Sequence, residues 1–238
     1  MSARRTPRAG WRSSEAVGAV LWQQARSARR GPVAAAPGTS ESSRDTPRHS
    51  MDDVGGFTLG RILERAADFD DRVDTLFDKL RGRPWADRLF YTASQLGDYG
   101  LIWLLLAALA AVGGSRRAER NIWRLAAVLG LDSMFVNGLL KSVIGRSRPV
   151  ADDGDRPLYL RQPITTAFPS GHASSAVVAA TLLGELGGRR WRGLLWLLAA
   201  TVALSRIHVR IHHASDVAGG LLTGTVLGHL ARRIWPLG

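Results

Sequence analysis

The stretch SRIHVRIHHASD at residues 205–216 gathers arginine, histidine and aspartate side chains in an otherwise apolar half of the chain. Two other polar islands precede it, KSVIGRSRP at residues 141–149 and PSGH at residues 169–172. Each island adjoins an apolar run of the kind that forms membrane helices. The candidate catalytic and binding residues therefore lie at the ends of predicted helices. Whether they meet depends on how the chain crosses the membrane.

Apolar segments after residue 98 predict an all-α integral membrane helical bundle with about five transmembrane helices. A membrane helix needs about 20 residues, so the first and shortest segment must recruit part of the helix before it. The last segment carries several glycines, which suit close helix packing in lipid. The five segments are residues 99–112, 122–144, 173–186, 193–204 and 217–234.

Three arginine clusters predict the orientation of the bundle. They lie in the short loops after the first and third segments and after the fifth, at residues 116–124, 189–192 and 232–233. Such clusters are typical of cytoplasmic loops. The three polar islands then all reach the opposite side. We therefore expect a multi-pass protein of the cell membrane with its active site on the outer face.

Upstream of the bundle the sequence predicts two further regions. Residues 1–50 are rich in Arg and Ser and bury too little apolar surface to offset their ordering entropy, which predicts a disordered tail. We also hypothesise that translation begins at Met51 and that the native protein lacks this tail.

Residues 51–98 form an amphipathic helical segment, because apolar residues recur at intervals of three and four between charges over residues 57–80. This helix is expected on the bilayer surface or on the bundle, with partner binding as the alternative. Pro84 ends it, and residues 85–96 predict a second helical piece leading into the membrane. Whether a sixth membrane segment is hidden here stays open. Residues 99–238 form the membrane domain.

The net charge of +12 raises nucleic acid as a partner. Beyond residue 99, however, the positive charge lies in short clusters between apolar runs, as in a membrane protein. We expect the membrane as a partner and no nucleic acid. The chain has no cysteine, which excludes disulfides and thiol chemistry.

The islands hold the groups that a phosphoryl site needs. Lys141, Arg148 and Arg206 offer one ammonium and two guanidinium groups for phosphate oxygens. Gly171 lets backbone N–H groups approach closely, and Ser170 can cap the helix that PSGH opens or donate to phosphate. These five residues predict an anion cradle without a metal.

Two histidines and an aspartate supply the reactive groups. His212 and Asp216 lie four residues apart, which places them on one face of a helix. The carboxylate can then hold one ring nitrogen protonated and leave the other to attack phosphorus. His172 is a second histidine that can protonate the leaving oxygen. As an alternative, the spacing of His208, His212 and Asp216 also suits a metal-binding face, but that interpretation leaves the other two islands unexplained.

Together the patterns KxxxxxxRP, PSGH and SRxxxxxHxxxD, in this order, resemble the type 2 phosphatidic acid phosphatase superfamily, which is distantly related to vanadium haloperoxidases. The resemblance covers the last 140 residues, roughly. It implies that His212 is the nucleophile and forms a phosphohistidine, that Asp216 orients it and that His172 is the general acid. It also implies that no cofactor is needed and that phosphate is bound by Lys141, Arg148, Ser170, Gly171 and Arg206.

Two features depart from the family pattern. His213 and Ala214 stand where an aromatic residue and proline are frequent, and family members usually have six spans. The resemblance still implies a metal-independent membrane phosphatase acting on a lipid phosphate monoester or diphosphate, such as a polyprenyl (di)phosphate, phosphatidate or phosphatidylglycerophosphate. The alternatives are a lipid phosphotransferase that uses the same site and a non-catalytic lipid-binding membrane protein. The oligomeric state stays open.

Overall fold

The computed structural model describes residues 51–113, 115–149 and 165–237, and these residues form helices and connecting segments without a strand. The predicted all-helical architecture is confirmed for this part of the chain, whereas the tail predicted at residues 1–50 lies outside it. The helices are α2 (Met51–Asp78), α3 (Pro84–Leu96), the 3-10 turn η1 (Asp98–Gly100), α4 (Leu101–Ala111), α5 (Arg116–Ser133), the π-helical segment η2 (Met134–Leu140), α6 (Lys141–Ile144), α7 (Gly171–Leu183), α8 (Arg189–His208) and α9 (Ala214–Ile234).

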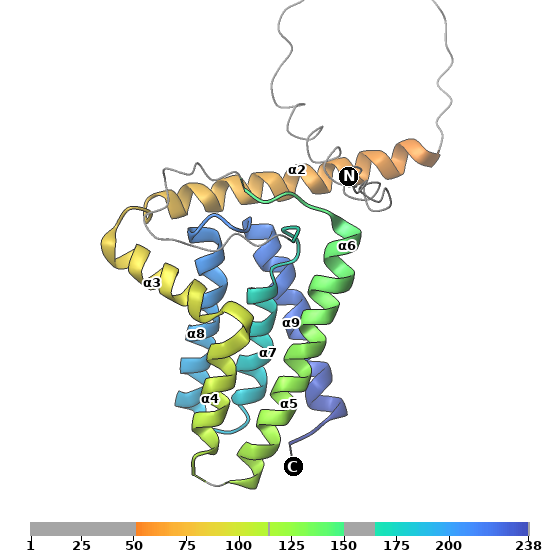
Figure 1. The fold of residues 1–238 in the computed structure, drawn as a ribbon. Helices are drawn as coiled ribbons and strands as arrows, with labels where there is room; N and C mark the ends of the chain where they lie inside the picture. Colours follow the sequence, from red (N-terminus) through yellow and green to blue (C-terminus); the bar gives the residue numbers. More distant parts are fainter. Residues whose placement is uncertain (1–50, 114, 150–164, 238) are drawn as a thin grey trace, which may run out of the picture.

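Five helices, α4, α5, α7, α8 and α9, run along a common direction, and α2 lies across one end of them (Figure 1). Helix α7 is the central element, since nearly all of its side chains are buried. Its many small residues allow the neighbouring helices to approach closely. An added Cβ at Gly220 of α9 would lie 2.3 Å from the backbone oxygen of Ser170. The glycines of α9 therefore hold the start of that helix directly against the start of α7.

The amphipathic helix predicted at residues 57–80 corresponds to α2. Its residues Val73 and Phe77 pack against a buried apolar cluster that includes Ala214 and Val217 of α9. The helix therefore rests on the end of the bundle, and the contact places α2 over the turn between α8 and α9 (Figure 1).

The segment before α4 is bent. Helix α3 and the stretch Asp98–Ala111 meet at an angle of 61°, with Tyr99 and Gly100 at positive φ values of 56° and 69° at the break. The left-handed conformation suits Gly100 and is unusual for Tyr99. The preceding helix that the first segment was expected to recruit therefore does not continue it in a straight line, and its part in a span stays a prediction.

By length and composition, one helix in the described part of the chain suffices to cross a membrane, Arg116–Ile144, which comprises α5, η2 and α6. The bent pair of α3 and α4 makes a second if it counts as a single span, and Gly171–Leu183 is apolar but shorter. The number of five spans stays a prediction.

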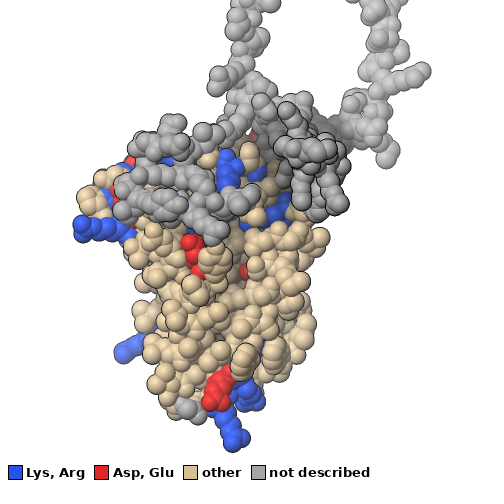
Figure 2. Space-filling view, in the orientation of Figure 1, with Lys and Arg blue, Asp and Glu red and all other residues tan. Residues whose placement is uncertain are grey.

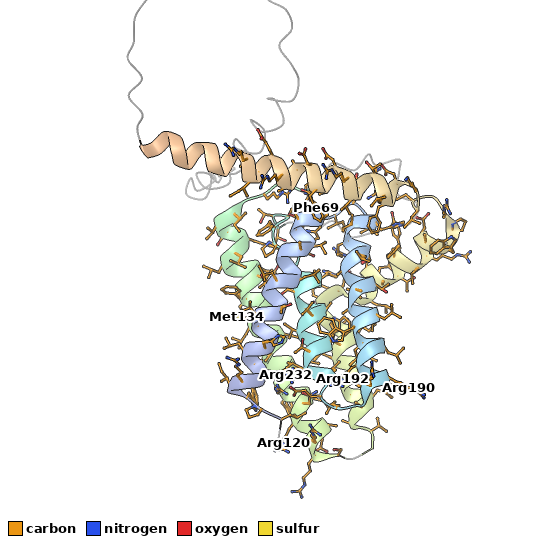
Figure 3. The ribbon with its side chains drawn as sticks, turned by 180° about the vertical axis from the view of Figure 1, so that it is seen from behind. Phe69, Arg120, Met134, Arg190, Arg192 and Arg232 are labelled. Carbon is orange, nitrogen blue, oxygen red and sulfur yellow. The ribbon has the colours of Figure 1, made fainter. Side chains whose placement is uncertain are left out.

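On the face shown in Figure 2, the surface between the two ends of the bundle is mostly uncharged. Charged side chains gather at the ends, and Figure 3 places Arg120, Arg190, Arg192 and Arg232 at the end opposite α2. Large apolar side chains are exposed between the ends, which soluble monomers rarely allow over a wide area. This belt is typical of a membrane protein. Among its members are Leu105, Leu131, Met134, Leu197 and Leu222.

Candidate active site

A cavity of about 550 Å³ lies between η1, the second half of α5, η2 and the start of α7. The bend before α4 and the π-helical segment η2 both form its wall, and π-helical segments are frequent at functional sites. Its polar lining consists of Asp98, Asp132, Ser133, Asn137, Lys141, Arg148, Thr165, His172, Ser175, Arg206 and His212.

The structure brings the three sequence islands together at this cavity. Of the eight site residues predicted from the sequence, Ser170 and Asp216 lie fully buried outside its lining, and the backbone N–H of Ser170 donates to the carbonyl oxygen of Asp216 at 2.9 Å. The others line it: Lys141, Arg148, Gly171, His172, Arg206 and His212.

Ser170 occupies the N-cap position of α7, as PSGH predicted. Its hydroxyl is buried and makes no hydrogen bond to any described residue, so the expected cap bond is absent. The adjacent helix start still offers its backbone N–H groups to an anion.

Lys141 and Arg148 are held in fixed positions. The Lys141 Nζ donates to Asn137 Oδ1 at 2.7 Å and to Thr165 Oγ1 at 3.1 Å. The Arg148 guanidinium donates to the carbonyl oxygens of Thr165 and Ile211, each at 2.9 Å. Burial lowers the pKa of Arg148 to about 10, against the opposing effect of Asp216, so the group stays charged at neutral pH. Both cations are therefore preorganised for an anion.

Arg206 supplies a third cation from the last turn of α8. Its side chain is only 2% exposed, and its Nη1 donates to the hydroxyl of Ser94 on α3. Its Nε has no hydrogen-bond partner among the described residues. A buried guanidinium with an unused donor is costly unless an anion satisfies it. An anion in the cavity beside Arg206 would supply that partner.

His212 does not lie on a helix. Because α8 ends at His208 and α9 begins at Ala214, His212 sits in the turn between them, and the predicted shared helical face with Asp216 is wrong. The turn nevertheless brings His212 Nδ1 to 3.7 Å from Asp216 Oδ2, slightly beyond hydrogen-bond length. Its Nε2 lies 3.4 Å from Arg148 Nη1, a donor, which leaves the proton on Nδ1.

The imidazole of His212 is neutral at neutral pH. Burial lowers its pKa to about 3; the positive charges of Arg206 and Arg148 act in the same direction, and Asp216 opposes them. A neutral imidazole with Nε2 at the cavity is the form that a nucleophile requires.

His172 binds a carboxylate that lies outside the three sequence islands. Its Nε2 lies 2.9 Å from Asp98 Oδ1, at the bend before α4. The bend fits closely around the ring, since an added Cβ at Gly97 would lie 2.9 Å from the Cδ2 of His172. The sequence GDYG, which interrupts an apolar run with turn residues, was the available signal.

The alternative metal-binding face is not formed. His208 lies among Phe77, Phe90 and Tyr91, with its Nε2 2.8 Å from Asp87 Oδ1. Nowhere in the described ranges do three or more His, Cys, Asp or Glu side chains form a cluster suited to a metal ion.

The described residues form a helical bundle with a cavity that is lined by three cationic side chains and two histidines. The chain belongs to the PAP2 superfamily, whose family model matches residues 121–237, and it is accordingly a phosphatase.

Three known proteins illustrate the relationship. The chain is 34% identical to decaprenylphosphoryl-5-phosphoribose phosphatase of Mycobacterium tuberculosis over 135 residues, which cover 57% of this chain and 72% of the relative. LpxE of Aquifex aeolicus has a similar structure, with a TM-score of 0.54, 25% identity and coverage of 67% and 93%. A PAP2-type phosphatidylglycerolphosphate phosphatase of Bacillus subtilis has the same TM-score of 0.54 at 18% identity, covers 93% of this chain and 95% of its own, and shows the fold alone.

Proposed function

We propose that this phosphatase hydrolyses a phosphate monoester or diphosphate of a membrane lipid, without a metal ion, through a phosphohistidine on His212. The observation that carries the proposal is the shared cavity of Lys141, Arg148 and Arg206 with His172 and His212. Three cations can neutralise the oxygens of a phosphoryl group, and the two histidines supply a nucleophile and an acid.

In the first step, His212 Nε2 attacks phosphorus and the bond from phosphorus to the leaving oxygen breaks. His172, protonated when the dianionic phosphate is bound, gives its proton to that oxygen. Asp98 holds the Nε2–H of His172, which leaves Nδ1 as the donor. Asp216 lies beside His212 Nδ1 and stabilises the positive charge that develops on the ring.

In the second step, water attacks the phosphohistidine. His172, now neutral, takes the proton of the water, and the bond from phosphorus to His212 breaks. Inorganic phosphate leaves, and both histidines return to their starting protonation states. The cradle of Lys141, Arg148 and Arg206 with the N–H groups around Gly171 serves both steps, because the phosphoryl oxygens stay in place.

The surroundings of the cavity favour a lipid substrate. Tyr99, which lines it, is 76% exposed, and Met134, next to the lining residue Ser133, is 72% exposed. Figure 3 shows Met134 on the outer side of the bundle. A lipid can place its phosphate in the cavity and leave its tail along this apolar surface. The M. tuberculosis relative, named for a decaprenylphosphoryl substrate, adds support for a polyprenyl chain.

We further propose a multi-pass protein of the cell membrane with five spans and the site on the outer face. The arginine-rich end opposite α2 would be cytoplasmic by the positive-inside rule. The cavity lies nearer the other end, in agreement with an outward-facing site.

The function is tested by phosphate release from purified protein in detergent, with excess EDTA, across polyprenyl phosphates and diphosphates, phosphatidate and phosphatidylglycerophosphate. We expect release from at least one lipid to be unchanged by EDTA. Loss of activity with EDTA, recovered by adding a divalent cation, would contradict a metal-independent site. Consumption of lipid phosphate without release of inorganic phosphate would instead indicate a phosphotransferase.

The pH dependence of kcat, which reports the enzyme–substrate complex, tests the two histidine roles. Because the pKa of His212 is lowered by burial, the neutral nucleophile persists well below pH 6.5, and activity should fall only as the pH approaches the lowered value. Before substrate binds, burial lowers the pKa of His172 to about 4, with Arg206 acting in the same direction and Asp98 opposing them. The bound phosphate dianion raises that pKa again, and on the alkaline side activity should fall as His172 in the complex loses the proton that it donates. The expected result is a bell-shaped profile with its acid limb below pH 6.5. A profile that is flat from acid to alkaline pH would count against the pair.

A further inference from the structure

A buried ion-pair network connects α2 to Asp216. We propose that Asp70 of α2 and Arg146 are positioning residues that hold Asp216 in place beside His212. Helix α2 thus contributes a side chain on which the active site depends. This inference rests on the proposed function, because it concerns how the nucleophile is supported. None of these three residues lines the cavity; Asp216 is connected to it by the 3.7 Å approach of its Oδ2 to His212 Nδ1.

Arg146 bridges two carboxylates from different helices. Its Nη1 donates to Asp216 Oδ1 at 2.5 Å, and its Nη2 donates to Asp70 Oδ2 at 2.6 Å. The exposed fractions are 4% for Arg146, 5% for Asp70 and 0% for Asp216. Charged groups are almost never buried to this extent unless they are paired. The burial of these three charged side chains therefore depends on their pairing with one another.

Asp70 also fixes the first turn of α9. Its Oδ1 accepts from the backbone N–H of Ser215 at 2.7 Å, and its Oδ2 accepts from the Ser215 hydroxyl at 2.9 Å. The Arg146 Nη1 donates to the same hydroxyl at 2.6 Å. A carboxylate at a helix N-terminus is favoured by the helix dipole. Figure 1 shows α2 crossing the bundle at the end where α9 begins.

The orientation of Asp216 depends on this network, because Arg146 binds its Oδ1 while His213 competes with His212 for its Oδ2. Asp216 Oδ2 accepts from the backbone N–H of His213 at 2.7 Å and lies 3.2 Å from His213 Nδ1, nearer than the 3.7 Å to His212 Nδ1. The bond from Arg146 to Oδ1 prevents the carboxylate from turning wholly toward His213. Arg146 thus keeps Oδ2 within reach of His212.

Asp70 has an electrostatic role that a purely structural contact would lack. A guanidinium paired with Asp216 alone would neutralise that carboxylate and weaken its support of a positive charge on His212. Asp70 takes up part of the Arg146 charge, so the network keeps a net negative charge behind His212. Phosphate binding occurs on the cavity side, and we therefore expect Asp70 to affect kcat and to leave KM unchanged.

The test measures kcat and KM for phosphate release in the full chain, with the lipid that the wild type prefers. Asp70→Asn is expected to lower kcat at least about tenfold, the effect of weakening one charge-assisted hydrogen-bond network, with KM unchanged. Asp71→Asn is the matched control, since it removes the adjacent, exposed carboxylate of the same helix and should keep wild-type kcat. In the Asp216→Asn background, Asp70→Asn should cause no further loss, because its effect acts through Asp216.

Arg146→Lys covers the case in which Asp70→Asn fails to fold. Lysine keeps the charge but cannot reach both carboxylates with a planar fork, so kcat should again fall, and again not in the Asp216→Asn background. Losses that multiply with that of Asp216→Asn, a raised KM, or a kcat for Asp70→Asn equal to that of Asp71→Asn would overturn the inference alone. A wild-type protein that releases no phosphate would overturn the proposed function and the inference with it.

Discussion

Phosphate release should disappear when His212 is replaced by alanine, with kcat lower by at least about 10³-fold. The expected loss is large because the variant removes the atom that bonds to phosphorus, and no other side chain in the described part of the cavity offers an equivalent nucleophile next to Arg148. Binding should suffer less, since the three cations of the cradle remain. The measurement is inorganic phosphate release from the preferred lipid under saturating conditions.

His229→Ala provides the matched control for this variant. His229 is exposed on α9, and its Nδ1 lies 2.9 Å from the carbonyl oxygen of Thr225 in the preceding turn. It lines a separate hollow with Arg232 and Arg233, two of the arginines assigned to the cytoplasmic end. Its replacement should leave kcat unchanged. If His212→Ala retained more than a small fraction of the wild-type rate, His212 would not be the nucleophile.

Arg206→Lys should lower kcat by about 10²-fold, although it keeps the positive charge. Arg206 is buried, one arm of its fork is held by Ser94, and its Nε is left without a partner among the described residues. The planar fork can bind Ser94 and a phosphoryl oxygen together, whereas an ammonium is a shorter, single point of charge. The contribution should be greatest in the transition state, where charge spreads over the phosphoryl oxygens.

Arg210→Lys separates this effect from a general loss of guanidinium groups near the end of α8. Arg210 lies four residues further on and pairs with Asp78 of α2 at 2.8 Å, away from the cavity lining. Its replacement should leave kcat near the wild-type value, because an exposed ion pair contributes little. Wild-type turnover in Arg206→Lys would remove Arg206 from the phosphate cradle.

The meeting of the islands at one cavity was predictable from the sequence, because successive antiparallel helices bring every second loop to the same end of a bundle. Lys141, Gly171 and Arg206 stand at or near the ends of α6, α7 and α8, as that parity requires. The helical architecture was predictable as well, since long apolar runs leave few alternatives to helices in lipid.

The carboxylates that bind Arg146 and His172 were not predictable from the sequence. Asp70 is 76 residues from Arg146 in the chain, and Asp98 is 74 from His172, so neither pairing leaves a local pattern. Both depend on how α2 and the bend before α4 dock on the bundle. The position of His212 was missed for a related reason: a spacing of four suits a helical face and, as here, a turn that runs into a helix start. Spacing alone does not distinguish the two.

The phosphohistidine on His212 is tested most directly by a rapid-quench experiment. The enzyme reacts with a lipid that carries ³²P in the cleaved phosphate, the reaction is stopped without acid, and the labelled peptide is identified. We expect an acid-labile, base-stable label on the peptide that contains His212, absent in His212→Ala and formed at least as fast as phosphate is released. Full turnover with no label on His212, or with the label on another residue, would contradict it.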